Sequence, residues 1–114
     1  MKLIRHEHQH LFEITNRLVA LTLNVNVHDL VQCYRGNQAT SRARQVSCYL
    51  MHTILSMSLV EIAKAYRKDR TTIGHACRLV EDLRDNPKFD QTLVELEETL
   101  KIVASLSMAL KARD

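Results

Sequence analysis

Residues 56–80, SMSLVEIAKAYRKDRTTIGHACRLV, constrain the fold more than any other stretch of the 114-residue chain. Ser58 and Glu61 have the spacing of a capping box, in which each side chain bonds the other residue's backbone N–H at a helix start. The run Arg67-Lys68-Asp69 then interrupts the apolar spacing, and Asp69 is placed to cap a second helix. Two short helices joined by a tight turn predict a helix-turn-helix.

The apolar residues of this stretch recur every three or four positions, which places them on one face of each predicted helix. They are Leu59, Ile62, Ala63 and Tyr66 before the turn, and Ile73, Ala76, Cys77, Val80 and Leu83 after it. The other face of the second helix is polar and carries Thr71, Thr72, His75 and Arg78. Such a helix fits the DNA major groove, so the motif predicts DNA binding. An αα-hairpin with a charged outer face has a similar pattern.

The composition favours an all-α fold. Aromatic residues make up 4% of the chain, with only two glycines and one proline, whereas sheets draw on aromatic and β-branched residues and their turns need glycine and proline. We expect one multi-helix domain with a central helix-turn-helix and a long C-terminal helix. Its parts are N-terminal helices over 1–34, a basic loop and helix-turn-helix core over 35–85, and the C-terminal helix over 86–114.

Charge is distributed unevenly along the sequence. From Arg35 to Arg78 eight Lys and Arg residues accompany two acidic residues, a net charge of +6. From Leu79 to Glu98 two basic residues accompany seven acidic ones, a net charge of −5. This segregation predicts one electropositive face that attracts phosphates and one segment that phosphates repel. The alternative is a solvated surface that is merely uneven.

Two helical segments are predicted near the N-terminus. Residues 3–23 have a helical period, with Leu11, Ile14, Leu18 and Leu21 as the inward stripe and Phe12, Val19 and Leu23 beside it. Asn26 is placed to cap a short helical turn after the interruption at Asn24.

A loop and a third helix are predicted next. Residues 32–40 have no apolar period and contain Gly36-Asn37, so they predict a loop that carries Arg35. Ser41 is the expected cap of a helix over 42–55. Its inward residues would be Val46, Tyr49, Leu50 and Ile54.

The C-terminal helix is expected to start at Asn86-Pro87, because proline at the first helical position loses no hydrogen bond. Its apolar seam recurs at spacings of three and four: Leu93, Leu96, Leu100, Val103 and Leu110. Packing on its own domain and pairing with another helix both fit such a seam. The second reading gives a homodimer through residues 93–110.

The residues give little support to other chemistry. Cys33, Cys48 and Cys77 are odd in number and lack CxxC spacing, which predicts reduced thiols. Cys77 lies near His75 in the manner of a nucleophile, but its inward position predicts a small buried hydrophobe. The histidines at 6 and 10 have helical metal-ligand spacing, but exposed polar surface is the expected role. We expect no enzyme, no cofactor and no metal.

No apolar run approaches the roughly 20 residues of a membrane span, and no signal peptide opens the chain. The sequence has no GxxxxGK[ST] phosphate loop, so it predicts no ATP site. The expected location is the cytoplasm, at the nucleoid.

Three segments resemble the C-terminal DNA-binding domain of the bacterial replication initiator DnaA. They are Ala43-Arg44-Gln45, Ser58-Leu59-Val60-Glu61-Ile62 and Asp69-Arg70-Thr71-Thr72-Ile73-Gly74-His75-Ala76-Cys77-Arg78. The last is similar to the hallmark of that family, Asp-His-Thr-Thr followed by an apolar pair and His-Ala-Cys-Arg. With the loop at Arg35 and the helices before it, the resemblance covers roughly residues 10–85.

The resemblance implies roles for individual residues. It places Asp69, Arg70 and Thr71 where the family reads bases in the major groove, and Arg35 in a basic loop whose arginine enters the neighbouring minor groove. The positions at which the family holds the DNA backbone are Arg44, Gln45, Leu59, Val60, Thr72 and His75. The basic face adds Arg42, Lys68 and Arg78 to the expected DNA-binding residues.

The sequence also departs from the family pattern. Arg70 stands where the family has a base-reading histidine, and His52 stands where a lysine is usual. The turn lacks one residue where the family has a Gly-Gly pair, and the basic loop keeps a single arginine, Arg35.

Two functions follow as hypotheses. The first is a sequence-specific double-stranded DNA-binding protein that regulates chromosomal replication initiation or transcription at sites related to initiator boxes. The second is a protein-interaction module that mimics the initiator domain and modulates DnaA or its regulators. DNA binding depends on Arg35, Arg44, Lys68 and Arg70, whereas interaction with replication-initiation proteins depends on the first and last helices.

Overall fold

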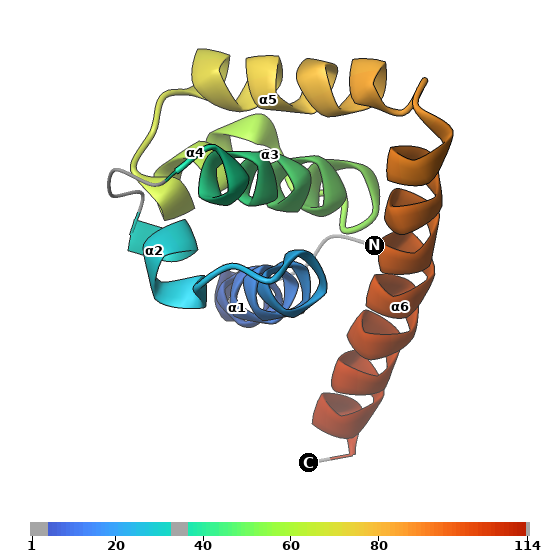
Figure 1. The fold of residues 1–114 in the computed structure, drawn as a ribbon. Helices are drawn as coiled ribbons and strands as arrows, with labels where there is room; N and C mark the ends of the chain where they lie inside the picture. The colour runs from blue at the N-terminus through green and yellow to red at the C-terminus, as the bar shows by residue number, and fades with distance from the viewer. Residues whose placement is uncertain (1–4, 33–36, 114) are drawn as a thin grey trace.

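The computed structural model describes residues 5–32 and 37–113 and folds them into helices (Figure 1). They are α1 (Arg5–Leu23), α2 (Val27–Gln32), α3 (Gln38–Thr53), α4 (Leu59–Tyr66), α5 (Arg70–Leu83) and α6 (Pro87–Ala112). Neither range contains a strand, which confirms the all-α prediction. Within the same two ranges, no helix combines the length and the apolar character that a membrane crossing requires.

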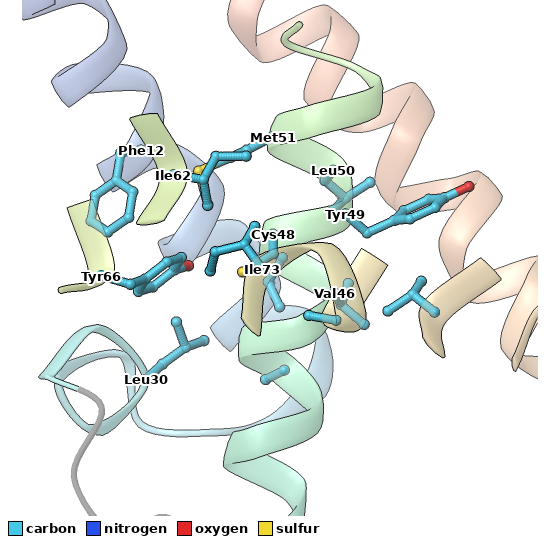
Figure 2. Packing of buried hydrophobic residues seen from close by; sticks show 14 of the residues in the cluster. Phe12, Leu30, Val46, Cys48, Tyr49, Leu50, Met51, Ile62, Tyr66 and Ile73 are labelled. Carbon is cyan, nitrogen blue, oxygen red and sulfur yellow. The ribbon is translucent and has the colours of Figure 1, made fainter. Parts of the chain in front are cut away.

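The third helix, α3, is the centre of the core. It contacts α1, α2, α4 and α5, with α1 and α5 on opposite sides (Figure 1). Val46, Leu50 and Met51 of α3 are fully buried, as the sequence predicted for Val46 and Leu50. Figure 2 shows Met51 close to Ile62 of α4. Both residues belong to the hydrophobic core cluster, which also contains Ile73 of α5. The helix-turn-helix therefore packs against α3.

The buried face of α1 differs from the predicted stripe. Leu11 is buried as expected, but Leu21 is 82% exposed, so its predicted inward position is wrong. Thr15 and Asn16 are buried instead, because the Thr15 hydroxyl donates to the Leu11 carbonyl at 2.7 Å and the Asn16 amide donates to the Phe12 carbonyl at 2.9 Å. Because these polar side chains are hydrogen-bonded to carbonyls of their own helix, they can lie on its buried face, and Leu21 lies on the exposed face.

Side-chain contacts among the described residues attach α1 to α4. The Tyr66 hydroxyl donates to Asn16 Oδ1 at 2.5 Å, and the Phe12 and Tyr66 rings meet edge to face with centroids 4.8 Å apart. Nearer the start of α1, His8 pairs with Glu61. The first helix of the motif is thereby held against α1 near both of its ends.

The start of α3 was predicted four residues too late. Asn37 caps the helix by accepting from the Thr40 N–H at 2.9 Å, and Ser41 lies inside the helix. The predicted loop over 32–40 is wrong at both ends, because α2 includes Gln32 and α3 includes 38–40. The predicted cap at Asn26 is confirmed, since its side chain accepts from the Asp29 N–H at 3.1 Å.

The beginning of α6 matches the prediction, and the first part of its apolar seam packs on its own domain. Asn86 accepts from the Phe89 N–H at 3.1 Å, with Pro87 as the first helical residue. Leu93, Leu96 and Leu100 are buried in the domain itself. The predicted pairing seam is therefore wrong over residues 93–100, because the rest of the chain already covers these leucines.

Arg84, the residue after α5, fixes the direction of α6. Its Nε donates to Asp90 Oδ1 at 2.6 Å, and its Nη1 and Nη2 donate to the Glu97 carboxylate at 3.0 and 3.1 Å. Nη1 also donates to the Tyr49 hydroxyl at 3.2 Å. The hydrogen bonds that Arg84 donates to Glu97 are the largest of the effects that raise the pKa of Arg84 above its ordinary value, against the opposing effect of burial. A bidentate guanidinium–carboxylate pair of this kind has a defined geometry.

Candidate nucleic-acid interface

The turn between α4 and α5 is closed by local hydrogen bonds. The Lys68 N–H donates to the Ala63 carbonyl at 2.9 Å, while Arg67 adopts a left-handed conformation with φ 58° and ψ 42°. Glycine is the usual residue at such a helix end because it lacks a Cβ. The sequence analysis missed the conformation of Arg67, for which the only signal was the shortened turn.

Both helices of the motif begin as the sequence predicted. The Glu61 N–H donates to the Ser58 hydroxyl at 3.1 Å, and the Ser58 N–H donates to Glu61 at 3.3 Å, which confirms the capping box. Asp69 accepts from the Thr72 N–H at 2.8 Å. This backbone hydrogen bond is the leading cause that holds the pKa of the Asp69 carboxyl below its usual range. The start of α5 thus carries an ionised cap.

The two faces of α5 separate as predicted. Its inward face buries Ile73, Ala76 and Val80 against the core. Its outward side chains are exposed: Arg70, Thr71, Thr72, His75 and Arg78. An exposed helix N-terminus with hydroxyl and guanidinium groups can donate hydrogen bonds to phosphates and base edges.

A hydrogen bond on this face orients the ring of His75. Arg78 Nη2 lies 3.0 Å from His75 Nδ1. A guanidinium only donates hydrogen bonds, so Nδ1 is the acceptor and the ring proton of the neutral imidazole is on Nε2. The exposed Nε2–H is then a donor suited to a phosphate oxygen.

A hollow of about 350 Å³ lies between α3 and α5. Its apolar lining comes from Cys48, Ile73, Ala76 and Leu79, and its polar lining from Ser41, Arg44, Gln45, Lys68, Thr72 and His75. The fold therefore brings together five of the residues expected to contact DNA, from two helices and the turn. The side-chain oxygen of Gln45 is buried without a hydrogen-bond partner among the described atoms.

Arg44 has a structural task besides lining this hollow. Its Nε donates to the Leu30 carbonyl at 2.9 Å, and its Nη2 donates to the Asp29 carbonyl at 3.2 Å. Carbonyls in the last turn of a helix lack partners within the helix, and Arg44 satisfies two of them in α2. The guanidinium is thus partly committed to the fold, which the sequence analysis did not predict.

The other predicted contact residues are spread around the hollow. Arg42 is half-buried on α3 and is not among the described residues that line it. Leu59 is half-buried and packs against the core, whereas the next residue, Val60, is 46% exposed. Arg35 lies outside the described residues, so its predicted role in the minor groove stays a prediction.

Gly74 lies between the motif's two helices without being needed there for packing. A Cβ at this position would meet Leu59 Cδ1 and Arg78 Nη1, each at the ordinary contact distance of 3.8 Å. Glycine in a helix interior costs about 1 kcal/mol relative to alanine, and no contact within the described chain requires it. A need for glycine at position 74 would therefore come from a molecule that binds close to α5.

The described thiols do not form a nucleophilic site. Cys48 is buried and Cys77 is half-buried, and neither is in a disulfide. Burial raises the pKa of the Cys77 thiol and so disfavours the reactive thiolate. No three His, Cys, Asp or Glu residues within the described part gather as metal ligands. Cys33 and the side chain of His6 lie outside that part.

Two short helices at a tight turn, with a polar outward face on the second, define a helix-turn-helix domain. A family model described as the bacterial dnaA protein helix-turn-helix matches residues 13–80. The chain belongs to this family, whose defining element is the helix-turn-helix. The resemblance drawn from the hallmark segment at 69–78 is confirmed.

Two curated relatives are named chromosomal replication initiator protein DnaA. The protein from Aquifex aeolicus (strain VF5) is 43% identical over 71 residues, which cover 61% of this chain. The protein from Rickettsia canadensis (strain McKiel) is 30% identical over 95 residues, which cover 82% of this chain. The matched parts amount to 18% and 19% of those relatives, so this chain corresponds to a small part of each.

Solved structures agree with the family. A crystal structure of a DNA replication initiation factor superimposes with a TM-score of 0.78 and 34% identity over 87% of this chain and 30% of its own. The replication initiator DnaA bound to AMPPCP and single-stranded DNA superimposes with a TM-score of 0.76 and 34% identity over 88% and 30%. The fold of this chain is therefore that of a DnaA segment.

Proposed function

We propose that this protein binds double-stranded DNA through α5 and the hollow beside it, and that it regulates replication initiation or transcription. The observation that carries the proposal is the outward face of α5, where Arg70, Thr71 and His75 are exposed next to a hollow lined by Arg44 and Lys68. The family is defined by a helix-turn-helix, and a structurally similar initiator is bound to single-stranded DNA, which supports a nucleic-acid ligand.

Different parts of this surface suit different parts of a duplex. Arg70 and Thr71 are the first residues of α5, and side chains there reach base edges when a helix enters the major groove. Arg70 can fork onto O6 and N7 of guanine. His75 and Lys68 lie at the rim of the hollow, where contacts to phosphates position the protein without reading sequence. We therefore assign the recognition of DNA sequence to the first residues of α5.

Binding of the full chain to labelled duplexes would test this assignment. Arg70→Ala should weaken binding to the preferred sequence by about 1–3 kcal/mol and relax the preference at one base pair. The matched control is Arg17→Ala, which removes the same charge from the exposed side of α1, across α3 from α5 (Figure 1). Arg17→Ala should bind as the wild type does.

Salt dependence separates phosphate contacts from base contacts. Lys68→Ala should weaken binding to all duplexes alike and reduce the slope of log affinity against log salt by about 0.9. If the wild type bound duplex DNA only weakly, with an affinity that did not change with salt concentration, the DNA-binding proposal would be contradicted. A loss equal on every sequence for Arg70→Ala would instead reassign Arg70 to the phosphates.

A protein-interaction function is the second candidate, because α1 and α2 present an apolar surface away from α5. Leu21 is 82% exposed and Val27 is 38% exposed. Both line a hollow of about 360 Å³ with Arg17, Ala20, Asn24 and Val25. Exposed leucine beside a hollow is typical of a site that a partner's side chain fills. This surface would serve a replication-initiation protein such as DnaA or one of its regulators.

Purified initiator and the Leu21→Asp variant distinguish the two functions. If the chain acts as an interaction module, Leu21→Asp should lose binding to the initiator or its regulator while DNA binding stays unchanged. Arg70→Ala should have the opposite effects. No measurable binding of the wild type to either class of protein would contradict the interaction function and leave DNA binding as the sole function.

A further inference from the structure

The C-terminal half of α6 has an apolar stripe that the described part of the chain leaves exposed. Ile102, Leu106 and Leu110 are 68%, 57% and 54% exposed. A spacing of four residues places them side by side along one line of the helix. Leu96 and Leu100, by contrast, face the opposite way into the core. An exposed apolar stripe on a regular helix is typical of a helix-pairing surface.

Charged residues continue the same line at both ends of the stripe. Glu95 lies seven residues before Ile102, and Arg113 lies seven residues after Leu106. Seven residues are close to two helical turns, so both charges fall on the line of the apolar stripe. Both residues are exposed and neither has an ion-pair partner among the described residues. The line thus runs from a negative end through an apolar centre to a positive end.

We propose that this line pairs with the same line of a second copy, in antiparallel orientation. A two-fold axis at the level of residue 104, on the exposed side of α6, sets Ile102 of one copy against Leu106 of the other, and the reverse. The same axis sets Glu95 of each copy against Arg113 of the other, because both pairs are symmetric about position 104. The proposed surface is self-complementary in its end charges and in the Ile102–Leu106 contact, whereas Leu110 of each copy lies opposite Glu98 of the other.

Parallel pairing of the same helices is disfavoured by the charges. It would place Glu95 beside Glu95 and Arg113 beside Arg113, and like charges across a helix pair destabilise it. A partner other than a second copy would need its own acidic and basic ends, in the reverse order. The chain itself supplies that pattern, which is why a second copy is the chosen occupant.

The position of the line leaves DNA binding free. In Figure 1 the far end of α6 lies at the bottom of the molecule, and α5 runs across the top. Two copies joined through α6 would each keep an open α5. The inference does not depend on the proposed function, since self-association is measured without DNA.

Sedimentation of the full chain over a range of concentrations tests the apolar part. The wild type should shift towards twice the mass of one chain at high micromolar concentration, and Leu106→Asp should remain a monomer. Ala39→Asp is the control, because it places the same charge on an exposed residue at the start of α3, outside α6, and should leave the dimer intact. Circular dichroism would verify that both variants keep their helices. A wild type that stays monomeric at several hundred micromolar would overturn the proposal.

A charge swap tests the antiparallel orientation. Glu95→Arg and Arg113→Glu should each weaken the dimer at least several-fold, because each creates two like-charge contacts. The double variant, Glu95→Arg with Arg113→Glu, should restore it, since both ion pairs form again with their signs exchanged. Failure of the double variant to recover the dimer would overturn the antiparallel arrangement.

Discussion

α5 and α6 are consecutive helices with similar inward faces and different outward faces. α5 buries Ile73 and Val80, and α6 buries Leu93 and Leu96. The outward face of α5 is polar and basic, whereas that of α6 begins with acidic residues and becomes apolar around Leu106. Burial explains the fold of both helices equally well. The outward faces therefore motivate the two proposals about partners, a polyanion for α5 and a protein helix for α6.

The prediction with the largest expected effect compares the stability changes caused by substitutions on the buried and exposed sides of α6. Leu96→Ala should lower the free energy of unfolding by about 2–5 kcal/mol, because it opens a cavity in the core. Leu106→Ala should change it by no more than about 0.5 kcal/mol, since Leu106 is 57% exposed. Denaturant unfolding at low protein concentration, where α6 is unpaired, measures both. Equal losses would mean that the domain covers Leu106 after all.

A second test concerns how α6 is joined to α5. Arg84→Met should destabilise the fold by about 1–3 kcal/mol, because the half-buried Glu97 loses its hydrogen-bonding partner. Arg78→Met is the control, since Arg78 is exposed on the outward face of α5. It should unfold close to the wild type. If both variants were equally stable, the Arg84 interactions would not determine the direction of α6.

The local signals in the sequence predicted α5 better than α6. The caps at Ser58, Asp69 and Asn86 each depend on residues two or three positions away, so sequence alone identifies them. The spacing of apolar residues also predicted which face of α5 is polar. It also placed Leu93 and Leu96 on one side of α6 without showing what covers them.

Features that depend on distant residues were missed for a physical reason. Asn16 is buried because Tyr66, fifty positions later, donates to it. Arg84 is positioned by Glu97 and Tyr49, and no periodicity indicates that three-way contact. In such cases burial is set by tertiary hydrogen bonds, and polarity alone misplaces the residue.

Gly74 gives a smaller and more specific test of the outward face of α5. Gly74→Ala should stabilise the fold by about 0.5–1 kcal/mol, because alanine is the better helix former and its Cβ fits at 3.8 Å from its neighbours. If DNA approaches the backbone closely at this point, the same variant should bind the duplex more weakly. Thermal unfolding and duplex binding measure the two effects separately. Ser105→Ala on α6, exposed and away from α5, should leave DNA binding unchanged.

Stronger binding or no change in binding for Gly74→Ala would show that the duplex keeps its distance from this turn of α5. A loss of stability would show that the helix needs glycine for its own packing, which the 3.8 Å contacts do not indicate.

The smallest expected effect concerns the caps at which the two helices begin. α5 begins at a carboxylate, Asp69, and α6 begins at an amide, Asn86, so acid affects only the first cap. Hydrogen bonding lowers the pKa of Asp69 in the folded state below its unfolded value, which is about 3.9. The stabilisation is therefore complete above about pH 4 and is lost as pH falls through the lowered folded-state pKa.

Asp69→Asn should remove this pH dependence, because asparagine is also a good N-cap and does not titrate. Unfolding measured between pH 2 and pH 6 should show a shallower loss of stability for the variant below pH 4, with similar stability near pH 6. Asp82→Asn is the control, since Asp82 is exposed on α5 and caps no helix. Identical slopes for wild type and Asp69→Asn would show that the capping bond does not favour the ionised carboxylate. A shallower slope would make the start of the recognition helix, and not the start of α6, the acid-sensitive end of this pair.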